Sequence, residues 1–248
     1  MDEPRTAIVT GAGKRVGAEI ARALIADGWT VLAHVRSDED DVPDGAVKVV
    51  ADLADPGCAD AIFAGAAGLP PVRLLVNNAA RFSRDGFGAF EPAEFDAHMA
   101  VNLRAPLLLT EAFAAAHAKD HSGAVDALVV NMLDAKLAAP NPDFLSYTLS
   151  KQALAGLTEL AARALAPKGI RVNGVAPALM LRSAGQSEEN FAAMQRANPL
   201  RRGVGPGDVI AALRYLIASP AVTGEVLTID GGQRFWSLER DVQFLERE

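Results

Sequence analysis

Two residues with complementary chemistry, Tyr147 and Lys151, stand four positions apart in the segment YTLSK. On a helix this spacing places both side chains on one face, one turn apart. A nearby ammonium favours the tyrosinate form, so we expect Lys151 to lower the pKa of Tyr147 from about 10 and to make it a proton donor near neutral pH. Such a pair is common by chance, and its significance depends on its place after the fifth predicted strand, at the carboxyl edge of a sheet, where ligands bind.

A second candidate site is the segment TGAGKRVG at residues 10–17, which follows an apolar run near the start of the chain. Gly11 permits a sharp turn, and Gly17 permits close packing of a helix on a strand. A helix that begins here offers free N–H groups and a partial positive charge to a pyrophosphate. We therefore expect a dinucleotide site whose contacts include Gly11, Lys14, Arg15 and Val16.

The end of the second predicted strand distinguishes NAD from NADP. An acidic residue there binds the ribose hydroxyls and repels a 2′-phosphate, but this chain has Arg36 and Ser37, with Lys14 expected nearby. The two cations and the hydroxyl suit a phosphate pocket, which predicts NADP(H). The alternative is that both cations are ordinary surface residues, since the acidic residues 38–40 follow at once and can either turn away or compete.

Short apolar runs alternate with longer, alanine-rich segments along the chain. The runs at 6–10, 29–35, 47–50, 73–78, 125–132, 170–175 and 225–230 are typical of strands in a parallel sheet covered on both faces. Helices are predicted near 14–27, 56–66, 92–119, 146–166, 187–197 and 206–219. The alternation predicts an α/β fold, a Rossmann-type doubly wound sheet with helices on both faces.

The connection between the second and third strands departs from this alternation. It is short, acidic and contains Pro43 and Gly45, so we predict a turn-like connection with at most one helical turn. No linker or repeat interrupts the pattern, and we expect residues 1–248 to form one domain.

Composition limits the class of protein. Half of the 248 residues are hydrophobic, the net charge is −7, and Cys58 is the only cysteine. The charge argues against nucleic acid as a partner, and the absence of a long apolar stretch or a signal-like start predicts a cytoplasmic protein that does not bind membranes. His117 and His121 have the spacing of metal ligands but no evident third partner, so we expect no metal site.

Several motifs together resemble the short-chain dehydrogenase/reductase family over essentially the whole chain. They are TGAGKRVG, the DL at 52–53, NNAA (77–80), VNLRAP around Asn102, YTLSK, RVNGVAP (171–177) and TGEVLTIDGG (223–232). The resemblance implies a seven-stranded sheet and hydride transfer from a nicotinamide. It implies that Tyr147 donates a proton, that Lys151 holds the cofactor ribose, and that Asn102 supports a water-linked proton relay. It further implies cofactor contacts from His34, Asp52, Leu53, Asn77, Ala79 and Pro177.

The departures from this family concern the substrate. Asp134 stands thirteen residues before Tyr147, where the family usually has a serine that donates a hydrogen bond to a carbonyl oxygen. An ionised aspartate only accepts hydrogen bonds and would raise the pKa of a nearby tyrosine. Asp134 therefore suits a nitrogen heterocycle with N–H donors or, when protonated, can act as an acid toward a ring nitrogen. The alternative is a drifted serine in a weakly active paralogue.

Two further residues agree with a heterocyclic substrate. Arg15 occupies the position of the middle glycine of the loop, and Phe82 follows NNAAR, where a ring can stack on a flat substrate. Together with Asp134 they resemble the pteridine reductases and the dihydromonapterin and dihydrofolate reductases of the family, which implies NADPH-dependent reduction of a pterin. The alternatives are that Phe82 belongs to the core and that Arg15 only clamps phosphate.

The last third of the chain is expected to close the substrate pocket. Residues 177–200 are predicted to form a lid, with Leu179 and Met180 as apolar walls. The tail, 233–248, contains Phe235 and Trp236, which we expect to pack against a neighbouring subunit, because the resemblance implies a homotetramer or homodimer.

Three functions remain open at this stage. The first is pterin reduction, the second is a general carbonyl or sugar-alcohol oxidoreductase of the same fold, and the third is a non-catalytic NADP-binding sensor. The presence of Tyr147, Lys151 and Asn102 argues against the third.

Overall fold

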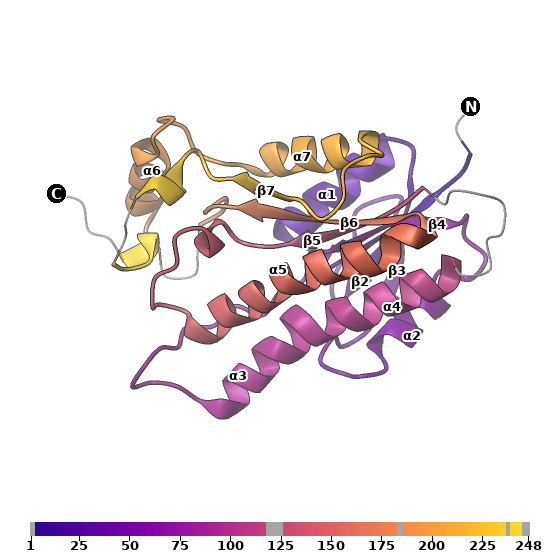
Figure 1. Cartoon of the computed structure of the whole chain (residues 1–248), viewed down its shortest axis with the longest axis horizontal. Coiled ribbons are helices and arrows are strands. Elements are labelled where there is room, and N and C mark those ends of the chain that lie inside the picture. Colours follow the sequence, from indigo (N-terminus) through magenta and orange to yellow (C-terminus); the bar gives the residue numbers. More distant parts are fainter. Residues whose placement is uncertain (1–2, 118–125, 183–185, 237–238, 245–248) are drawn as a thin grey trace.

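A computed structural model of the chain describes residues 3–117, 126–182, 186–236 and 239–244. Seven strands form one parallel sheet in the order β3-β2-β1-β4-β5-β6-β7 (Figure 1). The strands are β1 (Thr6–Thr10), β2 (Thr30–Val35), β3 (Val47–Val50), β4 (Val72–Asn77), β5 (Ala127–Met132), β6 (Ile170–Pro177) and β7 (Val226–Ile229). The doubly wound parallel sheet expected from the sequence is confirmed.

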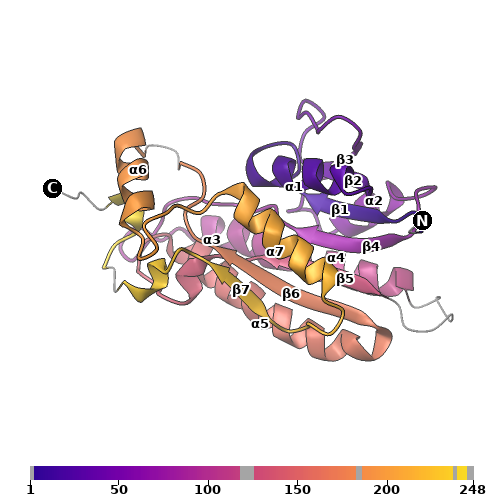
Figure 2. The same cartoon turned by 90° about the horizontal axis from the view of Figure 1, so that it is seen from above.

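Helices cover both faces of the sheet (Figure 2). One face carries α1 (Arg15–Ala26) and α7 (Pro206–Ala218), and the other carries α2 (Cys58–Ala64), α4 (Ala105–His117) and α5 (Leu145–Leu165). The remaining helices are α3 (Pro92–Met99) and α6 (Glu188–Ala197), with short 3-10 turns η2 (Ala135–Leu137), η3 (Ala166–Lys168), η4 (Gln233–Phe235) and η5 (Val242–Phe244). The helix expected over 92–119 is α3 and α4 joined by a π-helical turn, η1 (Ala100–Arg104).

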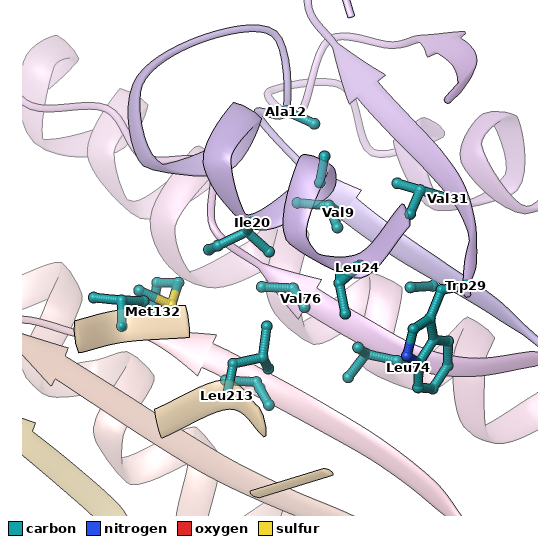
Figure 3. Packing of buried hydrophobic residues seen from close by; sticks show 14 of the residues in the cluster. Val9, Ala12, Ile20, Leu24, Trp29, Val31, Leu74, Val76, Met132 and Leu213 are labelled. Atoms are coloured by element: carbon teal, nitrogen blue, oxygen red, sulfur yellow. The ribbon is translucent and has the colours of Figure 1, made fainter. Parts of the chain in front are cut away.

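The four-residue apolar spacing in the first helix explains how it packs. Ile20 and Leu24 of α1 are almost completely buried and lie against the sheet residues Val9 and Val76 and against Leu213 of α7 (Figure 3). Two apolar helix faces thus close one side of the sheet, which fixes the start of α1 over the carboxyl end of β1.

The connection between β2 and β3, residues 36–46, contains turns and bends and no helix, as the sequence predicts. Strand order reverses between β1 and β4, and the crevice at such a switch point is where doubly wound folds bind dinucleotides. The loops after β1, β4 and β5 therefore meet at one edge.

None of the helices in the described ranges combines the length and apolar character that a membrane crossing demands. The described residues also contain no group of three or more His, Cys, Asp or Glu that could hold a metal ion. His117 is buried, with its Nδ1 2.7 Å from the carbonyl oxygen of Phe113, and His121 lies outside the described residues.

Candidate active site

Tyr147 and Asp134 come together at the carboxyl end of the sheet. Asp134 follows β5 as the N-cap of η2, and Tyr147 lies in the first turn of α5. The Tyr147 hydroxyl donates to Oδ2 of Asp134 at 2.9 Å, while the backbone N–H of Lys136 donates to Oδ1 at 2.8 Å. Both carboxylate oxygens are therefore engaged, and one of them holds the phenol.

Lys151 lies one turn farther along α5, as the spacing predicts. Its ammonium donates to the carbonyl oxygen of Met132 at 2.6 Å, and it lies 5.7 Å from the centre of the Tyr147 ring. The lysine is thus anchored on the end of β5 and is buried. Burial lowers its pKa to about 8, although the charge of Asp134 acts in the opposite direction.

The expectation that Lys151 lowers the pKa of Tyr147 is wrong. Burial raises the pKa of Tyr147 well above 10, and the charge of Asp134 and its hydrogen bond raise it further. Burial also raises the pKa of Asp134, partly offset by the hydrogen bonds from Lys136 and Tyr147 and by the charge of Lys151. The pair is accordingly biased toward keeping a proton rather than releasing it.

Aromatic rings form a wall beside this pair. The Phe82 ring stacks on Phe144 with a centroid distance of 4.3 Å and meets Tyr147 edge-on at 4.7 Å. Phe144 in turn stacks on Phe244 at 5.9 Å. Because Phe82 is 48 % exposed, it is a wall residue and not a core residue.

The loop that carries Phe82 is held on both sides. The Asn102 side chain accepts from the backbone N–H of Arg81 at 2.7 Å, donates to its carbonyl oxygen at 3.0 Å, and donates to the Ser150 hydroxyl at 2.9 Å. The backbone N–H of Ser83 donates to Nε2 of the buried His98 at 3.3 Å. Asn102 thus links the wall to α5, and its part in a proton relay stays a prediction.

A residue that the sequence analysis did not identify, Asp85, positions the start of α5. Its buried carboxylate accepts from the backbone N–H of Ser146 at 3.0 and 3.2 Å and from the Ser146 hydroxyl. A carboxylate is favourable at a helix N-terminus. The local N-cap position is Phe144, which has no polar side chain, so the cap comes from 61 positions upstream and no local pattern reveals it.

The glycine loop forms the cradle that a dinucleotide needs. Gly11 has a φ of +65°, and a Cβ on it would lie 3.0 Å from the Cα of Ala79. A Cβ on Gly17 would lie 2.1 Å from the carbonyl oxygen of Gly11, so only glycine fits there. The Asn78 side chain donates to the carbonyl oxygen of Thr10 at 2.8 Å, which ties the loop to the end of β4. Thr10 and Asn78 lie within the motifs TGAGKRVG and NNAA, but neither residue was expected to hold the loop in this way.

Other predicted cofactor residues differ in their placement. Arg36, Lys14 and Asp52 are exposed around the cradle, and Ser37 is half-buried. The side chains of Val16, Leu53 and Pro177 are buried, the first two within the apolar cores, so the backbone is what Val16 and Leu53 can offer. Asn77 is buried, and its Oδ1 has no hydrogen-bond partner among the described residues, which leaves an acceptor available beside the cradle.

His34 supports the cradle from behind. It is buried, its Nδ1 accepts from the backbone N–H of Gly11 at 3.2 Å, and its Nε2 lies 3.0 Å from the carbonyl oxygen of Ala51. Both ring nitrogens are therefore occupied by the chain itself. Burial lowers the pKa of His34, so the neutral ring that fits these two bonds is favoured.

Arg15 begins α1 with a φ of +53°, a left-handed conformation that favours glycine. Its exposed guanidinium is 3.5 Å from the carbonyl oxygen of Arg182, on the segment that follows β6. Arg15 thus reaches from the glycine loop toward the segment predicted as a lid. Leu179 and Met180 are half-buried on that segment, and Met180 packs against the apolar cluster of Ala135, Ala178 and Val204.

The described part of the tail makes contacts within its own chain, and the packing of Phe235 and Trp236 on a neighbouring subunit stays a prediction. The Arg240 guanidinium binds both carboxylate oxygens of Asp143 at 2.8 and 3.0 Å, and Asp241 accepts from Lys136 at 3.3 Å. Phe244 closes the aromatic stack described above. Phe235 remains 73 % exposed.

Comparisons with known proteins agree with this geometry. A family described as enoyl-(acyl carrier protein) reductase matches residues 11–234. Pteridine reductase 1 of Leishmania tarentolae is 31 % identical, covering 91 % of this chain and 95 % of that protein. L-xylulose reductase of Bos taurus is 32 % identical, covering 92 % and 96 %. A crystal structure of FolM alternative dihydrofolate reductase 1 from Brucella canis, complexed with NADP, has a TM-score of 0.85 at 35 % identity, with 94 % of each chain covered.

Proposed function

The chain belongs to the short-chain dehydrogenase/reductase family and is an NADP(H)-dependent oxidoreductase, and from this premise we propose that it reduces a pterin ring. The observation that carries the proposal is the hydrogen bond between Tyr147 and Asp134 beside the Phe82 ring. A carboxylate at this position offers nothing to a ketone oxygen, which is itself an acceptor. It does suit a heterocycle that presents N–H groups.

In the proposed reaction a C=N bond of the pterin ring becomes a C–N single bond. Bound NADPH, held by the glycine loop, would supply the hydride for the carbon and so be converted to NADP, and the nitrogen receives one proton. Tyr147 and Asp134 deliver that proton as a pair, because both have raised pKa values through burial and share a hydrogen bond. One proton taken up from solvent restores the pair.

The residues around the pair orient the substrate and the cofactor. Phe82 presents an aromatic face for stacking, and Arg15 contacts the substrate as well as the pyrophosphate. Lys151 holds the nicotinamide ribose while it is charged, below a pH of about 8. Leu179 and Met180 close the apolar side.

A substrate screen tests the proposal. Purified protein with NADPH is offered pterins, dihydropterins and dihydrofolate on one side and simple ketones and ketoses on the other, and NADPH oxidation is followed. We expect turnover with the first group alone. Turnover confined to ketones or ketoses would refute the proposal and would favour the sugar-reductase alternative, to which the L-xylulose reductase relative is comparably similar.

The Asp134→Ser variant tests whether Asp134 selects pterins over ketones, because it restores the hydrogen-bond donor that a ketone needs. We expect it to lose pterin turnover and to gain ketone turnover. A variant that keeps its native pterin activity would show that Asp134 does not select the substrate. Tight NADPH binding without turnover of any compound would instead indicate a non-catalytic sensor.

We also propose that the chain forms a homodimer or homotetramer. Large apolar side chains are exposed on outward helix faces, including Leu160 of α5 at 67 % and Tyr215 of α7 at 52 %. Light scattering coupled to size exclusion would test this, and a monomer at micromolar concentration would contradict it.

A further inference from the structure

The turn after β2 places one carboxylate where the 2′-phosphate of NADP has to bind. In doubly wound folds the adenosine ribose lies at the end of the second strand, and a cation there accommodates the 2′-phosphate. In this chain Arg36 and Ser37 follow β2 directly, and Lys14 belongs to the glycine loop. The backbone N–H of Ser37 is a donor that such a phosphate would use, but it already donates to Oδ2 of Asp40 at 3.2 Å.

The position of Asp40 is fixed by two further observations. Its backbone N–H donates to the carbonyl oxygen of Ser37 at 3.1 Å, which closes the turn. On the other side, a Cβ on Gly13 would lie 3.7 Å from the Cβ of Asp40 and 2.7 Å from the carbonyl oxygen of Asp41. Asp40 therefore lies between the turn and Gly13 of the glycine loop, the residue that precedes Lys14.

The neighbouring acidic residue Asp38 behaves differently. Its side chain is 93 % exposed and forms an ion pair with Lys48 at 3.3 Å, where Lys48 also donates to the Asp38 carbonyl oxygen. The sequence left open whether the acidic residues of this turn face away from the phosphate pocket or compete within it. The Asp38 side chain faces away from the expected phosphate pocket, toward Lys48, and the Asp40 side chain faces into the pocket, toward Ser37.

We propose that Asp40 is a specificity-determining residue that opposes the preference for NADP over NAD. Its carboxylate occupies the donor that the 2′-phosphate needs, and its charge repels the phosphate. Toward NAD it is an acceptor for the ribose 2′-hydroxyl, the role that acidic residues play at the end of this strand in NAD-binding folds. The positive charges of Arg36 and Lys14 favour NADP over NAD. The inference concerns the cofactor and is independent of which compound the enzyme reduces.

Binding measured without substrate tests this inference. The Asp40→Asn variant removes the charge and keeps an oxygen that can accept from Ser37, so the turn should persist. We expect its dissociation constant for NADPH, and for the fragment 2′,5′-ADP, to fall roughly five- to tenfold, as removal of one like charge a few ångströms from a phosphate predicts. The constants for NADH and for 5′-AMP should stay the same or rise. Asp38→Asn is the matched control and should change none of the four constants by more than about twofold, because a charge exposed to water is strongly screened.

Three results would overturn the proposal. The first is an Asp40→Asn variant whose ratio of NADH to NADPH dissociation constants is unchanged, and the second is an equal shift in the Asp38→Asn control. The third concerns Asp40→Ser, which also removes the charge and keeps a short acceptor. If both neutral variants bind NADPH more weakly than the native chain, Asp40 only stabilises the turn.

Discussion

Replacing Asp134 by asparagine removes the charge of this side chain and preserves its shape. The amide oxygen can accept from the Lys136 backbone N–H, and the amide nitrogen can donate to the Tyr147 oxygen, so both contacts of the native carboxylate keep a counterpart. The variant therefore isolates the energetic consequence of the charge. We expect Asp134→Asn to be more stable than the native protein at pH 8 and at least a hundredfold less active toward the pterin, since proton transfer by a positioned group contributes about 10²–10⁴-fold.

The expected gain in stability follows from the direction of the pKa shift of Asp134. Burial raises the pKa of Asp134 in the folded chain, so the folded state binds its proton more tightly than the unfolded state does. The native protein therefore loses stability as the pH rises from about 4, the unfolded value, through the folded pKa. Each unit of upward shift corresponds to about 1.4 kcal/mol. For a chain of this size, each kcal/mol of this difference moves Tm by about 2–4 °C.

Thermal unfolding across the range from about pH 2 to 9, without cofactor, measures this difference. Asp143→Asn is a control in which the change in stability should have the opposite sign, because hydrogen bonds from Arg240 lower the pKa of Asp143. That variant should lose stability at neutral pH, and the loss should disappear as the pH falls through the folded pKa. A difference in Tm between Asp134→Asn and the native protein that is constant with pH, or negative at pH 8, would refute the reasoning.

Four other predictions concern the groups around this pair. Burial lowers the pKa of Lys151 to about 8, so kcat/KM should fall as the pH rises above about 8, and Lys151→Arg, which stays charged, should lack that decline. Arg15→Gly should raise KM for the pterin more than the dissociation constant of NADPH, with little change in Tm, because glycine adopts the left-handed conformation without strain. Burial lowers the pKa of His34, so the native protein should lose stability relative to His34→Gln as the pH falls below about 6.5, which differential unfolding would detect. Asp85→Ala should lower Tm by several degrees and reduce kcat, and Asp85→Asn should restore most of both, since an amide oxygen can still cap Ser146.

The strands and the cofactor cradle could be predicted because their signals are local. A short apolar run predicts a buried strand, and a glycine loop after such a strand predicts close packing. At Gly17 a Cβ would lie 2.1 Å from the carbonyl oxygen of Gly11, so the glycine is required there. The spacing of Tyr147 and Lys151 likewise placed both on one face of α5. The break in the long helix at Asn102 has no such signal, because a π-helical turn is fixed by what its side chains reach, here the Arg81 backbone and Ser150.

The electrostatics of the site could not be predicted from that spacing. The spacing within one helix accounts for the ammonium of Lys151, and Asp134 was expected from the sequence to raise the pKa of Tyr147. What the spacing does not show is the burial of Tyr147, which raises its pKa most. The spacing also does not show that the Lys151 ammonium donates to the carbonyl oxygen of Met132 on β5. The contact between Arg240 and Asp143 joins residues 97 positions apart and depends on how the tail folds.

Arg15 shows how a local rule and a functional site come into conflict. Its φ of +53° is the conformation for which the loop normally uses glycine, and a non-glycine residue there costs about 1–2 kcal/mol. A phosphate clamp alone does not require this position, because Lys14 beside it is a cation in an unstrained conformation. What Lys14 lacks is the reach across to the carbonyl oxygen of Arg182, which Arg15 has. The left-handed conformation of Arg15 is therefore explained by this contact with the segment that follows β6, and it agrees with the role proposed for Arg15 at the substrate.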